Sequence, residues 1–168
     1  MRTLILALAL LAAACSPPAQ DTEPAPENPY IAALTAASPP GAWAARTDEG
    51  TTSVCFGEFL ADCAIDINCT MGMGHITISI EQQPRRPANQ DVTVRFFTAT
   101  QTLDVGARTW NQEGLPNVLA GFSDGDAEKD PFIDMLSTPT ERFGVEIGNT
   151  RTVFPWDASV ASVLTACR

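Results

Sequence analysis

The alternation of apolar and polar residues predicts a β-rich domain in the second half of the chain. From His75 to Ile80 isoleucine occupies every second position, which places Ile76, Ile78 and Ile80 on one face of an extended strand. Gly148 and Asn149 supply a turn that predicts a hairpin. Similar short apolar segments predict further strands at residues 92–96, 103–105, 118–122, 143–147 and 152–154.

End signals and apolar spacing predict two helices near the C-terminus. Asp130 is expected to cap the first, with Pro131 at its first helical position. Asp157 is expected to cap the second, whose buried face is Val160, Val163, Leu164 and Cys167. A short helix at residues 30–37, stopped by two prolines and a glycine, could pack on the domain or fray. We therefore expect an α+β fold, a mainly antiparallel β-sheet with a C-terminal helix packed on it.

The first 14 residues have the pattern of a secretory leader. Arg2 precedes an apolar run at residues 4–13 that is too short to span a bilayer. The run ends in Ala12-Ala13-Ala14-Cys15, which resembles the bacterial lipobox, although Ala12 stands where Leu or Val is more usual. The resemblance implies cleavage before Cys15, acylation of Cys15 and, because Ser16 follows, retention in the outer membrane. The alternative is an ordinary secreted protein in which Cys15 is left over.

The chain then divides into a tether and one domain. Residues 16–29 contain five prolines and no apolar periodicity, which predicts an extended segment. We expect a signal peptide at residues 1–14, a lipidated cysteine, tether and possible short helix at 15–40, and a single globular domain at 41–168.

Cysteine number agrees with a lipid anchor. The chain has five cysteines, so acylation of Cys15 leaves an even number for disulfide bonds: Cys55, Cys63, Cys69 and Cys167. A zinc site would need a CxxC pair, and an oxidising compartment favours disulfides. Of the three possible pairings, Cys55–Cys167 with Cys63–Cys69 is preferred. Every pairing bonds Cys167 to one of the three earlier cysteines, Cys55, Cys63 or Cys69.

From Phe132 to Cys167 the expected order is helix, strand, turn, strand, helix and final cysteine. This order resembles the end of small periplasmic domains such as the invasion-associated locus B proteins, and of accessory lipoproteins of type VI secretion. The similarity covers only the last part of the chain and rests on no invariant motif. It implies a disulfide-tied β domain that binds something, and it assigns no site residue.

The charge balance narrows the expected partners. Acidic residues outnumber basic residues by 20 to 10, which gives a net charge of −10. Such a surface repels phosphate, so nucleic acid is not an expected partner, and attraction to anionic headgroups is disfavoured. Membrane attachment is therefore expected through the lipid.

Candidate chemistry gathers around His75, the single histidine of the chain. A Ser-His-Asp or Cys-His hydrolase would have to use it, but no GxSxG motif is present, and we expect a solvent-facing ring and a protein that is not an enzyme. Met71, Met73 and His75 alternate, so in an extended segment they would lie on one side, and such soft ligands suit Cu(I). Copper binding is therefore the alternative function. Both methionines could instead fill gaps in the core.

Two other features could bind ligands. Asp124, Asp126, Glu128 and Asp130 could offer oxygens to calcium, but the EF-hand pattern is absent, and a solvated turn before a helix is the preferred interpretation. Trp43, Trp110 and Trp156 are expected to pack in the core or at sheet edges, although an exposed tryptophan could mark a binding surface.

The leading hypothesis combines these features. The anchor, the tether and a disulfide-tied domain predict an outer-membrane lipoprotein on the periplasmic face. Its domain is expected to be a non-enzymatic module that binds an envelope protein or a cell-wall component, without a cofactor.

Overall fold

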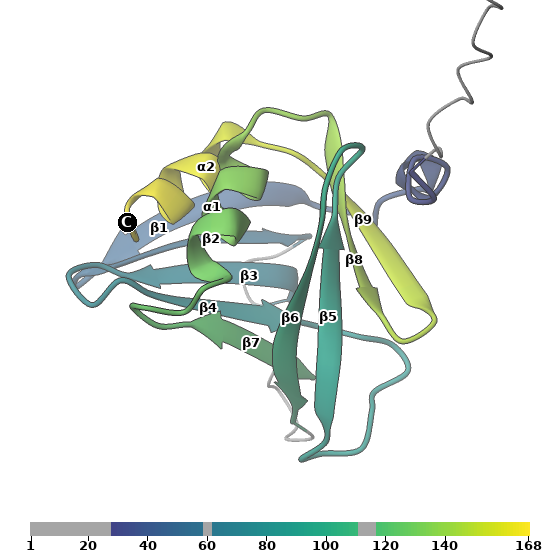
Figure 1. Ribbon diagram of the computed structural model, residues 1–168, viewed down its shortest axis with the longest axis horizontal. Helices are drawn as coiled ribbons and strands as arrows, with labels where there is room; N and C mark the ends of the chain where they lie inside the picture. Colours follow the sequence, from purple (N-terminus) through teal and green to yellow (C-terminus); the bar gives the residue numbers. More distant parts are fainter. Residues whose placement is uncertain (1–27, 59–61, 111–116) are drawn as a thin grey trace, which may run out of the picture.

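A computed structural model of the chain describes residues 28–58, 62–110 and 117–168. Within these ranges the chain forms a nine-stranded antiparallel sheet and two α-helices (Figure 1). The strands are β1 Ala42–Asp48, β2 Thr51–Gly57, β3 Cys63–Thr70, β4 His75–Ile80, β5 Asp91–Phe97, β6 Thr102–Thr109, β7 Val118–Phe122, β8 Arg142–Ile147 and β9 Thr150–Pro155. The helices are η1 Ala33–Thr35, a 3-10 turn, then α1 Lys129–Ser137 and α2 Ala158–Thr165. The predicted α+β class is confirmed.

The sheet is strongly curved and forms a half-barrel. Its strand order is β1-β2-β3-β4-β7-β6-β5-β8-β9. Figure 1 shows β5 and β6 running across the direction of β3 and β4. The first and last strands meet at one corner, where the indole Nε1 of Trp43 donates a hydrogen bond to the carbonyl oxygen of Pro155 (2.6 Å).

Both helices pack on the inner face of the sheet and complete its core. Phe132 of α1 lies with its ring centroid 5.0 Å from Phe96 of β5 and 4.9 Å from Phe122 of β7. The other helix, α2, packs against β1, β2, β3 and α1. Burial of such large aromatic side chains contributes about 1.5–3 kcal/mol each, so the core couples the two halves of the sheet.

Six of the nine described strands were predicted, and three were missed. The predicted bounds of β4 and β7 match the structure, and Ile76, Ile78 and Ile80 are all buried. Strands β1, β2 and β3 were not predicted. Strands β1 and β2 are rich in alanine, serine and threonine and have no clear period-two pattern, so they owe their conformation to pairing with neighbours. Strand β3 does alternate, with Ile65, Ile67 and Cys69 buried, and the sequence interpretation overlooked it.

The start of α1 differs from the prediction, whereas α2 agrees with it. Helix α1 begins at Lys129, after Glu128, whose side chain makes no capping hydrogen bond. Pro131 therefore lies inside the first turn, where its missing N–H group leaves no intrahelical bond unmade. In α2, Asp157 accepts a hydrogen bond from the backbone N–H of Ser159 (2.8 Å), which confirms the predicted cap.

The structure pairs the four predicted cysteines differently from the preferred arrangement. The bonds are Cys55–Cys63, separated by 8 residues, and Cys69–Cys167, separated by 98. The preferred pairing is wrong because the β2–β3 hairpin brings Cys55 and Cys63 together. Cys69 instead lies among the buried residues of β3 and meets the end of α2.

Residues 28–38, here called the strap, pack on the outer face of the sheet. The Asn28 side chain donates to the carbonyl of Ala99 (2.9 Å), and Tyr30 stacks on Phe97 with centroids 4.5 Å apart. Arg142 donates to the carbonyls of Leu34 and Ala36 (2.8 and 2.7 Å). The predicted helix at 30–37 is thus reduced to η1, and the packed region extends N-terminal of residue 41.

Candidate binding surface

Three loops and the C-terminus gather at one end of the half-barrel, which we call the loop pole (residues 48–50, 71–75, 123–130 and Arg168). The backbone N–H of Met71 donates to the carbonyl of Gly50 (2.8 Å), which joins the β3–β4 turn to the β1–β2 turn. His75 Nδ1 lies 3.3 Å from the Ser123 hydroxyl, which joins the same turn to the β7–α1 loop. In Figure 1 these turns lie at the left, opposite the strap.

The β3–β4 turn presents two methionines to solvent. Met71 is 41% exposed and Met73 is 71% exposed, so neither fills a core gap. Gly72 and Gly74 adopt left-handed φ angles of 79° and 57°, which bend residues 71–74 into a turn. The expectation of an extended segment from Met71 to His75 is therefore wrong at residues 71–74.

An ion pair between a buried lysine and an exposed aspartate holds the β7–α1 loop over this turn. Lys129, whose side chain is only 8% exposed, donates through Nζ to Asp124 Oδ1 at 2.5 Å. Gly74 lies directly beneath: a Cβ at this position would overlap Asp124 Oδ1 and come within 2.6 Å of Lys129 Nζ. A side chain at position 74 would have to displace these two flexible side-chain ends, and the left-handed φ of 57° also favours glycine there. The charge of Lys129 is paired with Asp124.

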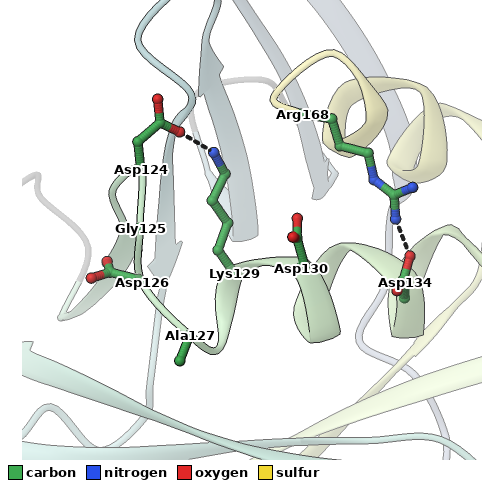
Figure 2. Close-up of a pocket in the computed structure, with 8 residues that line it drawn as sticks. All are labelled: Asp124, Gly125, Asp126, Ala127, Lys129, Asp130, Asp134 and Arg168. Atoms are coloured by element: carbon green, nitrogen blue, oxygen red, sulfur yellow. Dashed lines mark hydrogen bonds and ion pairs between the residues drawn. The ribbon is translucent and has the colours of Figure 1, made fainter.

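The start of α1 and the C-terminus line a shallow hollow of about 720 Å³. Figure 2 shows Lys129 facing Asp124, and Arg168 reaching from the C-terminus to form an ion pair with Asp134. Asp126 accepts a hydrogen bond from the backbone N–H of Ser123 (2.7 Å), as expected of a turn. In the described part of the chain, no three His, Cys, Asp or Glu residues are arranged to hold a metal ion.

The structure brings His75 beside Ser123, a contact that sequence spacing did not reveal because the two residues are 48 positions apart. The His75 side chain is half-buried rather than fully solvent-facing. A general base must lie about 2.6–3.2 Å from the heavy atom whose proton it removes, and a third group must orient it. Among the hydrogen bonds of the described residues, no carboxylate orients this imidazole.

A charged row crosses the outer face next to the strap. Asp104, Arg95, Glu146 and Arg151 are register partners on β6, β5, β8 and β9, so charges alternate across the sheet. Arg95 donates to both oxygens of Asp104 (2.6 Å each) and to the hydroxyl of Tyr30 (2.8 Å). The guanidinium of Arg95 lowers the pKa of Asp104, against a smaller opposing effect of burial. The row therefore holds the strap and is not free for a ligand.

Two of the three tryptophans pack against the core, and the third is exposed. Trp43 and Trp156 are partly buried against the core, as predicted, and Trp156 Nε1 donates to the carbonyl of Leu136 (2.8 Å). Trp110 is 44% exposed at the end of β6.

The lipidation site predicted at Cys15 lies outside the described residues. Within the described ranges, no helix has the length and hydropathy needed to cross a bilayer. The chain matches no protein-family model, no curated protein and no solved structure. Its function must therefore be inferred from its own residues.

Proposed function

We propose that this chain is an outer-membrane lipoprotein anchored through Cys15, whose folded region is a non-enzymatic binding module for an envelope protein or a cell-wall component. The observation that carries the anchor is the cysteine pairing. Four of the five cysteines bond to one another, and Cys15 is the fifth. Acylation gives the odd cysteine a chemical role in an oxidising compartment.

Two features support binding as the role of the folded region. The sheet is tied by two disulfides and holds its loops in fixed positions, the arrangement on which binding residues are commonly displayed. Two of the large apolar side chains exposed in the described ranges, Met71 and Met73, lie in one turn of these loops. Copper binding by Met71, Met73 and His75 was suggested by an extended segment, and residues 71–74 form a turn instead.

Metabolic labelling with radioactive palmitate tests the anchor. The wild-type chain should incorporate label and Cys15→Ala should not, because the acylated residue has been removed. Ser16→Ala is the matched control and should be labelled normally. Label in Cys15→Ala equal to wild type would refute acylation at this position.

Membrane fractionation tests the compartment separately. The wild-type chain should co-sediment with outer membrane, whereas Ser16→Asp should move to the inner membrane if the residue after Cys15 acts as the lipobox resemblance implies. Recovery of the wild-type chain in the inner-membrane fraction would contradict the proposed location while leaving acylation intact.

A further inference from the structure

We propose that the loop pole docks a cationic polypeptide segment that places apolar side chains against Met71 and Met73. This inference deepens the proposed binding function by naming the surface and the chemistry of its partner. It begins from the exposure of these methionines, 41% and 71%, in the single turn at the tip of the β3–β4 hairpin. Methionine is flexible and polarizable, and it is over-used on surfaces that bind peptides.

The two thioethers are carried on an ordered support. The Met71 N–H donates to Gly50, and the Met73 N–H donates to the carbonyl of Thr70 (3.3 Å). Cys69, one residue before the strand ends, is bonded to Cys167 of the C-terminal segment. A partner would therefore contact a preformed tip, and little conformational entropy would be lost on binding.

Charge selects the partner. Every carboxylate on the pole is solvent-exposed: Asp48, Glu49, Asp124, Asp126, Glu128 and Asp130. The two cations are engaged, since Lys129 is paired with Asp124 and Arg168 with Asp134. The field around the methionines is thus negative, which attracts a Lys- or Arg-rich segment and repels phosphate, anionic lipid and a second copy of the same pole.

The loop pole also lies on the side of the folded region opposite the strap, where the folded region begins (Figure 1). The described chain begins at Asn28, held against the carbonyls of Thr98 and Ala99. In Figure 1 the strap lies at the right and the turns of the loop pole lie at the left, so the pole points away from the side where the tether joins.

The test is peptide binding to the full chain, purified from whichever fraction contains it and followed by fluorescence anisotropy. The probe is a fluorescein-labelled peptide with paired lysines at both ends and two central leucines. Its comparison peptides replace the leucines by serine, or the lysines by glutamate. Peptide binding does not depend on acylation of Cys15. A negative result in the peptide assay can therefore be told apart from a negative result in the palmitate experiment.

Met71→Ser/Met73→Ser should weaken binding of the leucine peptide by about tenfold. The variant loses apolar area that the peptide would otherwise bury, and that loss lowers the binding free energy by the amount that a tenfold change in Kd represents. The same change should have no effect on the serine peptide. Glu49→Gln/Glu128→Gln should weaken binding of both lysine peptides and reduce its salt dependence. Ile31→Ser/Glu141→Gln, which makes matched changes away from the pole, should bind as wild type does.

Three outcomes would overturn the proposal. These are equal affinity of wild type and Met71→Ser/Met73→Ser for the leucine peptide, tighter binding of the glutamate peptide, or weakening by the Ile31→Ser/Glu141→Gln control as large as that at the pole. A Cu(I) titration is run on the same proteins. Tight Cu(I) binding lost in Met71→Ser/Met73→Ser, with unchanged peptide affinity, would assign the methionines to copper instead.

Discussion

Removal of the Cys69–Cys167 bond is expected to destabilise the fold more than removal of the Cys55–Cys63 bond. The two double substitutions Cys69→Ala/Cys167→Ala and Cys55→Ala/Cys63→Ala make the same chemical change. They differ in the loop that each bond closes, 98 residues against 8. The longer loop restricts the unfolded chain more strongly, and its bond also holds α2 on β3.

The magnitude follows from the chain-entropy relation. It gives about 4.7 kcal/mol for the 98-residue loop and about 2.5 kcal/mol for the 8-residue loop, a difference of about 2.2 kcal/mol. Cys69 and Cys167 are almost fully buried, so loss of their sulfur atoms also leaves a small cavity and acts in the same direction.

Urea unfolding at equilibrium, followed by tryptophan fluorescence without reductant, is the appropriate assay. With a slope of about 2 kcal/mol per molar urea, the midpoint of Cys69→Ala/Cys167→Ala should lie about 1 M below that of Cys55→Ala/Cys63→Ala. Equal midpoints, or a lower midpoint for the short-loop variant, would refute the reasoning that the C-terminal bond is the main covalent constraint on the fold.

Three further predictions concern packing, the strap and pH. Gly144→Ala should destabilise the fold by about 1–3 kcal/mol, because a Cβ there would overlap the buried ring of Phe97 in β5. A Cβ at Gly106 would meet no atom, so Gly106→Ala should be nearly neutral. Equal melting temperatures for the two variants would contradict this. Tyr30→Ala should raise amide hydrogen exchange throughout the strap. Tyr30→Phe keeps the stacking on Phe97 and loses the hydrogen bond from Arg95, so it should raise exchange less. Unchanged exchange in Tyr30→Ala would show that the ring does not hold the strap. Asp157→Ala should cost about 1 kcal/mol and Asp157→Asn much less, because asparagine also caps helices. Hydrogen bonds from the hydroxyl and then the N–H of Ser159 lower the pKa of Asp157, so the cap contributes fully above about pH 4 and is lost as the pH falls through the folded-state pKa. The urea midpoints of wild type and Asp157→Ala should therefore converge in acid, and a gap that persists there would count against the cap.

The parts of the fold that could be predicted from sequence are those in which one residue pattern determines the structure. Strict alternation at His75–Ile80 predicted β4 to the residue, and Asp157 with its apolar spacing predicted α2. Strands β1 and β2 carry small and hydroxylated residues, and their conformation depends on pairing partners elsewhere in the chain.

The candidate site was harder to predict, because it is assembled from contacts between distant segments. The identities of the disulfide cysteines followed from counting, but their pairing depends on the β2–β3 register. Lys129 pairs with Asp124 over Gly74, which lies 50 residues before Asp124 in the chain. Exposure of Met71 and Met73 depends on a turn at residues 71–74, where alternation suggested an extended segment.

The most direct test of the central claim is mass spectrometry of the mature chain, isolated from membranes without reductant and mapped by proteolysis. The account predicts an N-terminal peptide that begins at Cys15 and carries acyl chains, together with the cross-linked peptides Cys55–Cys63 and Cys69–Cys167 and no free thiol. An unmodified Cys15, or a mature N-terminus at another residue, would contradict the assignment of this protein as an anchored envelope lipoprotein.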